Sequence, residues 1–260
     1  MTTFKLHEIS SAENNHFKLW MQLTRSKGIN KHHLFFLSGE KIVREFLQDK
    51  EHSTLEIAAE VRKKDSQPLT QAPQYLLTGE LFQKLDSLGT NFNLLLISFS
   101  SFETYDFEKE SKGIEVISPL GDPSNLGALA RSCLAFGVQN LILTTESCHP
   151  FHPKALKSSA GALLKLKIFK APPLQEVLQT SPAPLYALDS QGELLTKLTF
   201  PKNLRFLLGE EGPGLTQGQK TKTVAKSIRL VRIETQNVES LNASVAGSLF
   251  LFYLSQIKGQ

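Results

Sequence analysis

From Ile114 onward, short apolar runs alternate with segments of helical periodicity, and this alternation constrains the fold more than any other feature of the sequence. Strands separated by helices favour a mostly parallel sheet that is covered by helices on both faces. Ligands of such sheets bind at the carboxyl ends of the strands, in the loops that lead into helices. The expected strands are 114–117, 141–143, 166–169, 185–188, 206–208 and 228–233, and the expected helices are 125–136, 153–159, 216–225 and 240–255.

The first hundred residues carry a separate series of strand and helix patterns, which predicts a smaller α/β domain. Residues 100–113 are polar, acidic and without periodicity, and we interpret them as an interdomain linker. We therefore expect an N-terminal domain over residues 1–108 and a C-terminal domain over residues 109–260. The expected N-terminal strands are 34–37, 55–58, 75–77 and 94–99, and helices are expected around Phe17, from about Glu40 and around Leu81.

The composition is that of a globular protein, with 40% hydrophobic and 21% charged residues. No apolar run reaches the roughly 18 to 20 residues that a membrane helix needs, and the polar N-terminus lacks the apolar core of a signal peptide. Two cysteines, Cys133 and Cys148, cannot form a disulfide framework and suit a reducing compartment. We therefore expect a cytoplasmic protein without a membrane partner. The net charge of +4 permits a nucleic-acid partner only through a local basic patch.

Three loop segments of the second half are unusual. The first, 121–137, places Pro123 before a helix whose start Ser124 or Asn125 can cap, with Arg131 on another face. A capped helix with a surface arginine would explain these residues equally well.

The second segment, 206–215, has three glycines in six positions after a buried strand, as in a tight loop against a small ligand or a plain turn. It has neither the lysine of a Walker loop nor the spacing of a dinucleotide fold. The third segment, 232–254, runs through a polar loop into a helix that begins with small residues and ends apolar. Core packing explains the apolar end, but it explains the polar cluster 239–244 poorly.

Together the three segments resemble the signature motifs of the SpoU/TrmH family, the RNA ribose 2′-O-methyltransferases of the SPOUT superfamily. DPSNLGALARSCLAFG is similar to the first motif, LLGEEGPGL to the second and VESLNASVAG to the third, in order and at family spacing. The motif residues fall on Asn125, Arg131, Glu211, Asn242 and Ser244. In the first half, FFLSGEKIVREFL is similar to the start of the ribosomal-protein-like domain with which many of these enzymes recruit substrate.

The resemblance implies a parallel-sheet α/β domain threaded into a trefoil knot, which binds S-adenosylmethionine largely through backbone groups. By position it assigns cofactor contacts to Leu208, Gly209, Ile233, Leu241 and Asn242. Family members are homodimers with an active site across the interface, so a homodimer through the C-terminal domain is expected.

The implied reaction is an in-line displacement at a sulfonium carbon by a ribose hydroxyl, which requires no metal. Family proposals assign the hydroxyl proton to the arginine at Arg131. Because a guanidinium stays protonated in proteins, we expect Arg131 to stabilise the developing alkoxide instead. The residues expected to orient Arg131 and the ribose are Asn125, Glu211, Asn242 and Ser244.

RNA recruitment should rest on phosphate contacts. The best patch comprises Arg25, Lys27, Lys31 and His32, between the first expected helix and strand, although most charged loops are simply solvated. We expect 23S rRNA as the substrate; the alternatives are a tRNA 2′-O-methyltransferase and a non-catalytic RNA-binding protein of ribosome assembly. No metal is expected, because the ligands crowded at Cys148, His149 and His152 match no common zinc spacing.

Overall fold

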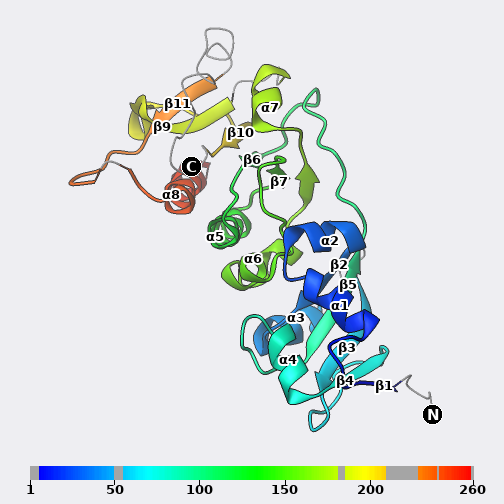
Figure 1. Ribbon diagram of the computed structural model, residues 1–260. Helices are drawn as coiled ribbons and strands as arrows, with labels where there is room; N and C mark the ends of the chain where they lie inside the picture. The colour runs from blue at the N-terminus through cyan, green and yellow to red at the C-terminus, as the bar shows by residue number, and fades with distance from the viewer. Residues whose placement is uncertain (1–5, 50–54, 181–184, 209–227, 239, 259–260) are drawn as a thin grey trace. The chain divides into compact units, whose positions relative to one another are not determined.

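The computed structural model describes residues 6–49, 55–180, 185–208, 228–238 and 240–258. The chain forms two compact units (Figure 1). The first contains the residues up to Ser101 together with 149–164, and the second contains 102–148 and the residues from Lys165 onward. The chain therefore passes between the units after Ser101, Cys148 and Leu164. The predicted functional division at residue 108 stays a prediction.

The first unit is built on a five-stranded mixed sheet in the order β1-β4-β3-β5-β2. β4 pairs in parallel with β1 and β3, whereas β5 pairs antiparallel with β2 and β3. Its strands are β1 (Leu6–Ile9), β2 (Leu34–Leu37), β3 (Leu55–Lys63), β4 (Gln74–Leu77) and β5 (Leu94–Phe99). Its helices are α1 (Asn15–Gln22), α2 (Ser26–His32), α3 (Glu40–Gln48), α4 (Gly79–Leu85), α6 (Pro153–Ser158) and the short 3-10 helix η1 (Ala162–Leu164).

The second unit is built on a six-stranded parallel sheet in the order β11-β9-β10-β6-β7-β8. This confirms the parallel α/β architecture expected from the alternating pattern. Its strands are β6 (Ile114–Ser118), β7 (Asn140–Leu143), β8 (Ile168–Lys170), β9 (Leu185–Leu194), β10 (Leu204–Leu207) and β11 (Ile228–Arg232). Its helices are α5 (Pro123–Ala135), α7 (Leu174–Thr180), α8 (Ala243–Lys258) and the short 3-10 helix η2 (Leu195–Lys197).

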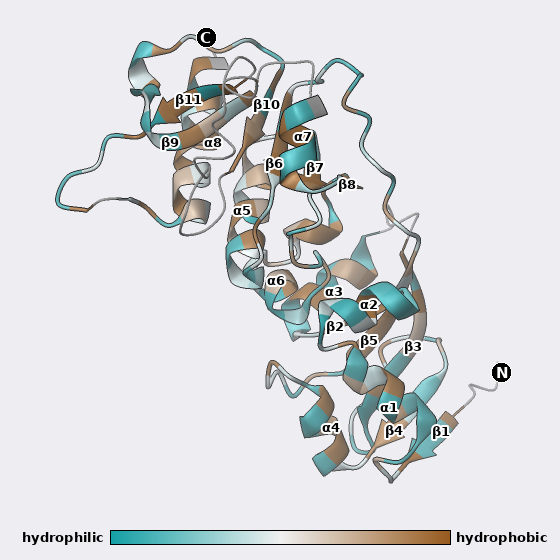
Figure 2. Ribbon diagram, turned by 45° about the horizontal axis from the view of Figure 1, so that its top comes forward, coloured by the Kyte–Doolittle hydropathy of each residue, from teal (hydrophilic) through white to brown (hydrophobic). Residues whose placement is uncertain are grey.

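Helices cover both faces of this second sheet. Each face is formed by alternate side chains of the strands. Ile117 and Leu207 belong to a buried cluster with Leu174 of α7 on one face. On the other face, Phe206 of β10 packs against Phe250 of α8, with ring centroids 4.3 Å apart. Figure 1 shows α5 and α8 side by side on this second face, and the central strands are brown in the hydropathy colouring of Figure 2.

The polar segment 100–113 is a free linker only in part, which corrects the prediction from sequence. Tyr105 and Phe107 are buried, and backbone hydrogen bonds join residues 103–105 to Lys170 of β8. Arg205 of β10 pairs with Glu115 of β6 at 3.2 Å, and its guanidinium also donates to the carbonyls of Phe107 and Lys109. The polar, acidic sequence of the segment did not indicate these buried contacts.

Two other segments differ from the expectation. Leu6–Ile9 forms an edge strand that the polar N-terminal composition concealed, and the stretch 26–32 is helical where a loop was expected. The expected helix 216–225 lies outside the described residues. Among the described residues, none of the helices combines the length and apolar character needed to span a membrane.

Candidate active site

The strand order of the second sheet creates a switch point between β6 and β10. From β6 the chain continues through α5 to β7 on one side, whereas β10 lies beside β9 and precedes β11 on the other side. Ligands of parallel α/β sheets bind where neighbouring strands lead apart in this way. The first and second sequence motifs begin here, and the buried Leu208 after β10 donates its N–H to the carbonyl of Ile117 at 3.1 Å.

The start of α5 is capped by Asp122, not by Ser124 or Asn125 as the sequence suggested. The Asp122 carboxylate accepts the N–H groups of Ser124 and Asn125, both at 2.9 Å. Pro123 stands at the first helical position, where its missing N–H costs no hydrogen bond. Because Asp122 satisfies these donors, the side chain of Asn125 is left available for tertiary contacts.

Asn125 meets Asn242 and Ser244, which lie more than a hundred residues later in the chain. The Nδ2 group of Asn242 donates to Oδ1 of Asn125 at 3.1 Å, and Oγ of Ser244 lies 3.4 Å from the same atom. Ser244 Oγ also donates to Oδ1 of Asn242 at 2.7 Å. The first and third motifs thus share one polar cluster, which we call the Asn–Asn–Ser cluster.

Asn242 has a second function, because it caps α8. Its Oδ1 accepts the N–H groups of Ser244 at 3.0 Å and Val245 at 3.3 Å. The two halves of the amide are therefore both used: the oxygen stabilises the helix start and the nitrogen fixes Asn125. An asparagine is suited to this position because it offers both an acceptor and a donor.

Close packing of α8 on α5 holds the cluster in place. A Cβ atom at Gly247 would lie 3.0 Å from Leu129 of α5 and 3.2 Å from Leu208, so any side chain there would require these leucines to shift. One turn further on, Ser248 Oγ lies 2.6 Å from Ser132 Oγ. The missing side chain at Gly247 thus allows α8 to lie close to α5 and to the end of β10.

Arg131 does not join this cluster. It lies six residues after Asn125, about 240° around the helix axis, and its side chain is exposed. It forms no hydrogen bond or ion pair with any residue that the structure describes. The expected orientation of Arg131 by Asn125, Asn242 and Ser244 is thus not seen within the described chain. Glu211 and Gly209, which were also assigned to the site, lie outside the described residues.

Three of the described residues that were assigned to the cofactor pocket, Leu208, Ile233 and Leu241, are apolar. Ile233 follows β11 and Leu241 precedes Asn242, and both are half-buried, so they present apolar surface that remains partly open. In the loop between them, Thr235 Oγ donates to the carbonyl of Val238 at 3.0 Å. The buried Leu208 completes the set at the end of β10. These assignments stay predictions.

The crowded cysteine and histidines have structural contacts instead of metal-site geometry. Nδ1 of His149 accepts the N–H of Phe151 at 3.1 Å, and Nδ1 of His152 caps α6 by accepting the N–H of Lys154 at 3.2 Å. Burial, with a smaller contribution from Asp122, raises the pKa of the Cys148 thiol to about 12. No group of three metal-ligating side chains occurs in the part of the chain that is described.

The predicted RNA patch lies on α2. Arg25, Lys27 and Lys31 are exposed, and Lys27 and Lys31 are one helical turn apart. His32 is half-buried, and its Nε2 lies 3.2 Å from Oε1 of Gln22. The helix therefore presents two lysines and an arginine to solvent, whereas His32 is tied to α1.

Two solved methyltransferase structures share the fold of this chain. The AdoMet-bound rRNA methyltransferase of Sinorhizobium meliloti superposes with a TM-score of 0.78 over 97% of this chain and 98% of that one, at 18% identity. The SpoU methyltransferase AviRb of Streptomyces viridochromogenes, also with AdoMet, gives a TM-score of 0.77 over 95% and 98%, at 18% identity. The likeness shows the fold, and it confirms the fold class expected from the sequence.

Sequence comparison then identifies the family. The model of the SpoU rRNA Methylase family matches residues 114–252, and the chain belongs to this family. A protein of Syntrophobacter fumaroxidans named ribosomal RNA small subunit methyltransferase G 2 is 36% identical over 100% of this chain and 52% of its own length. An uncharacterized tRNA/rRNA methyltransferase of Synechocystis is 30% identical over 68% of this chain and 65% of its own. The chain thus spans between half and two thirds of these two relatives.

Proposed function

We propose that the protein transfers a methyl group from S-adenosylmethionine to a ribose 2′-hydroxyl of ribosomal RNA. The observation that carries this proposal is the Asn–Asn–Ser cluster, which joins two family motifs at the switch point of a SpoU-type sheet. Two solved structures of this fold contain AdoMet. Relatives named as 2′-O-methyltransferases of 23S rRNA include RlmP of Bacillus subtilis, which is 23% identical over 96% of this chain and 99% of its own length.

When bound, S-adenosylmethionine supplies an electrophilic methyl carbon on a sulfonium leaving group. The remaining tasks belong to the protein: to align the hydroxyl and to stabilise the charge that develops on its oxygen. The cluster of Asn125, Asn242 and Ser244 offers amide and hydroxyl groups that are already oriented by one another. Arg131, which stays protonated, stabilises the alkoxide or the adjacent phosphate, and the hydroxyl proton passes to water.

We further propose that the active protein is a homodimer formed through α8. Val245, Leu249 and Phe252 are spaced i, i+4, i+7 on this helix and are 47%, 43% and 50% exposed. A stripe of this kind suits a helix contact with a second copy. A partner subunit would also supply contacts to Arg131, which forms no hydrogen bond or ion pair with a described residue of its own chain.

The finer assignment to 23S rRNA rests on the N-terminal unit and on relatives such as the B. subtilis enzyme. The relative from Syntrophobacter is named for the small subunit, but this chain matches only 52% of it. The Synechocystis relative is named for tRNA or rRNA. We therefore propose large-subunit rRNA in the cytoplasm and treat the other RNAs as outcomes of the test.

The test is transfer of labelled methyl from S-adenosylmethionine to unmodified 23S rRNA, 16S rRNA and tRNA, with Arg131→Ala as the control. Label in 23S rRNA that resists alkali as a 2′-O-methyl dinucleotide, and that is absent with the variant, supports the proposal. Label in tRNA alone overturns the choice of RNA. If free rRNA and assembling ribosomal particles both stay unlabelled and the cofactor does not bind, the protein is a non-catalytic RNA-binding member of the family.

A further inference from the structure

The first unit carries five cationic side chains from two distant segments. Arg25, Lys27 and Lys31 belong to the α2 segment, and Lys154 and Lys157 belong to α6; all five are exposed. Lys154 and Lys157 are three residues apart and so lie on one side of α6. We call these five residues the basic face. Only its α2 part was recognisable from the sequence, because α6 lies between two strands of the methyltransferase sheet.

Direct contacts bring the two segments together. Oγ of Ser26, the first residue of α2, accepts the N–H of His149 at 3.2 Å. Beneath them, Phe35 of β2 stacks on Phe151, with ring centroids 4.3 Å apart. Both helices contact β2, and the bond from His149 to Ser26 joins their starts, so α2 and α6 are neighbours within the first unit.

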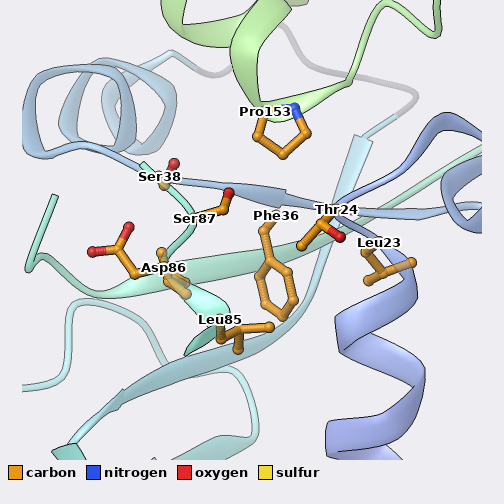
Figure 3. Close-up of a pocket in the computed structure, with 9 residues that line it drawn as sticks. Leu23, Thr24, Phe36, Ser38, Leu85, Asp86, Ser87 and Pro153 are labelled. Atoms are coloured by element: carbon orange, nitrogen blue, oxygen red, sulfur yellow. The ribbon is translucent and has the colours of Figure 1, made fainter. Parts of the chain in front are cut away.

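A small cavity beside this contact shows how tightly the segments pack. Thr24, just before α2, and Pro153, the first residue of α6, line it together with Phe36 and Ser87 (Figure 3). Its free volume is about 10 Å³, which holds at most one water molecule. The cavity is therefore too small for a ligand, and it marks a packed junction beneath the basic face.

Acidic residues are excluded from both segments. There is no Asp or Glu between Glu13 and Glu40, and none between Glu146 and Glu176. None of the five basic side chains forms an ion pair with a described residue. Several other lysines of the unit have an acidic partner: Lys84 lies 2.6 Å from Glu80, and Lys41 lies 3.9 Å from Glu45. The five cations of the basic face differ from these lysines because no described carboxylate pairs with them.

We propose that α6 and α2 together bind the phosphodiester backbone of the substrate RNA, with Lys154 and Lys157 as phosphate contacts. This inference rests on the proposed function, because it takes RNA as the substrate. Lysines act as point charges toward phosphate and carry no sequence information. The basic face therefore contributes affinity and orientation, while the choice of nucleotide is made elsewhere.

RNA binding would then involve residues of the methyltransferase region as well as the N-terminal residues. Residues 149–164 lie within the region matched by the family model, yet they pack with the N-terminal unit. A recruiting surface limited to residues 1–108 would omit them. Deleting the N-terminal domain would accordingly remove only part of the RNA contact.

The experiment compares two double variants of the full chain that lose the same charge. Lys154→Ala/Lys157→Ala removes the α6 part of the basic face, and Lys41→Ala/Lys84→Ala removes two ion-paired lysines. Affinity for an unmodified 23S rRNA fragment is measured by fluorescence anisotropy across a salt series. We expect the α6 variant to bind more weakly, with a log–log salt slope about 1 to 2 smaller in magnitude. The control should keep the slope of the wild type.

A third variant, Lys27→Ala/Lys31→Ala, tests whether the two parts act on one RNA. Combined with the α6 pair, it should lower the slope by about the sum of the separate changes. An unchanged slope in the α6 variant, or an equal decrease in the control, overturns the proposal. Thermal melting confirms that each variant is folded. Methyl transfer tests the proposed function separately. A protein that binds RNA through the basic face but transfers no methyl would contradict the proposed function alone.

Discussion

At the scale of single residues, Asn242 is the most informative position, because its oxygen and its nitrogen have different tasks. Asn242→Asp keeps the oxygen that caps α8 but removes the Nδ2 donor to Asn125. We expect this variant to keep its thermal stability and to lose about tenfold or more in methyl transfer, equivalent to ~1.4 kcal/mol of transition-state stabilisation.

Asn242→Ala is the matched comparison. It loses the cap as well, which should lower the free energy of unfolding by about 1 kcal/mol. Urea unfolding and methyl transfer, measured on both variants, separate the two roles. If the Asp variant turned over as fast as the wild type, the bond from Asn242 to Asn125 would have no part in the reaction.

At the scale of elements, the buried pair of Glu115 and Arg205 ties β6, β10 and the segment 102–113 into one body. Both side chains are fully or almost fully buried, and the Tyr105 hydroxyl donates to Glu115 at 2.5 Å. Arg205→Met leaves a buried carboxylate without its cation, so we expect a loss of about 3–5 kcal/mol in the free energy of unfolding. Urea titration measures it.

The double variant Glu115→Gln/Arg205→Met provides the control for this prediction. It removes the buried charge together with its partner, and the Glu115→Gln amide keeps an oxygen as an acceptor for Tyr105 or Asn140. It should therefore be more stable than Arg205→Met alone. A double variant as unstable as the sum of both single changes would show that the charge itself is not the cause.

The same network makes stability depend on alkaline pH. Burial and then the hydrogen bond to Glu115 raise the pKa of Tyr105 from 10.0 to about 12. Because the folded pKa is raised, this contribution is complete below pH 10 and is lost as the pH rises from 10 toward 12. The free energy of unfolding, measured by urea titration across this pH range, should decrease more steeply for the wild type than for Tyr105→Phe. Parallel curves would contradict the assignment.

At the scale of the whole molecule, the exposed stripe on α8 determines the expected assembly. Phe252→Asp would place an unpaired carboxylate in the proposed subunit contact. We expect the dissociation constant of the dimer to rise about 100-fold or more and the rate of methyl transfer to fall in parallel. Sedimentation velocity over a concentration series measures it. The control is Leu6→Asp, at an apolar residue that is 54% exposed on β1; it should leave the dissociation constant and the rate of methyl transfer unchanged. A wild type that sediments as a monomer while it transfers methyl would refute the dimer.

The sequence by itself determined the strands of the second sheet, their parallel arrangement and the residues of the first and third motifs. These follow from local signals: apolar periodicity sets β6, β10 and α8, and the motif spacing places Asn125 and Asn242. The error at the α5 cap was also local, since Asp122, Ser124 and Asn125 all have side chains that can cap a helix and only the backbone path selects Asp122.

Only the tertiary structure decided which distant residues meet. Hydrogen bonds such as Asn125 to Asn242, ion pairs such as Glu115 to Arg205 and the junction of α2 with α6 join segments that are about 90 to 120 positions apart. No local pattern encodes such a contact, because its free energy comes from burial and complementarity that exist only in the folded chain. Packing therefore decided that the acidic segment 102–113 is anchored and that the basic helix α6 lies beside α2. The composition of these segments indicated neither contact.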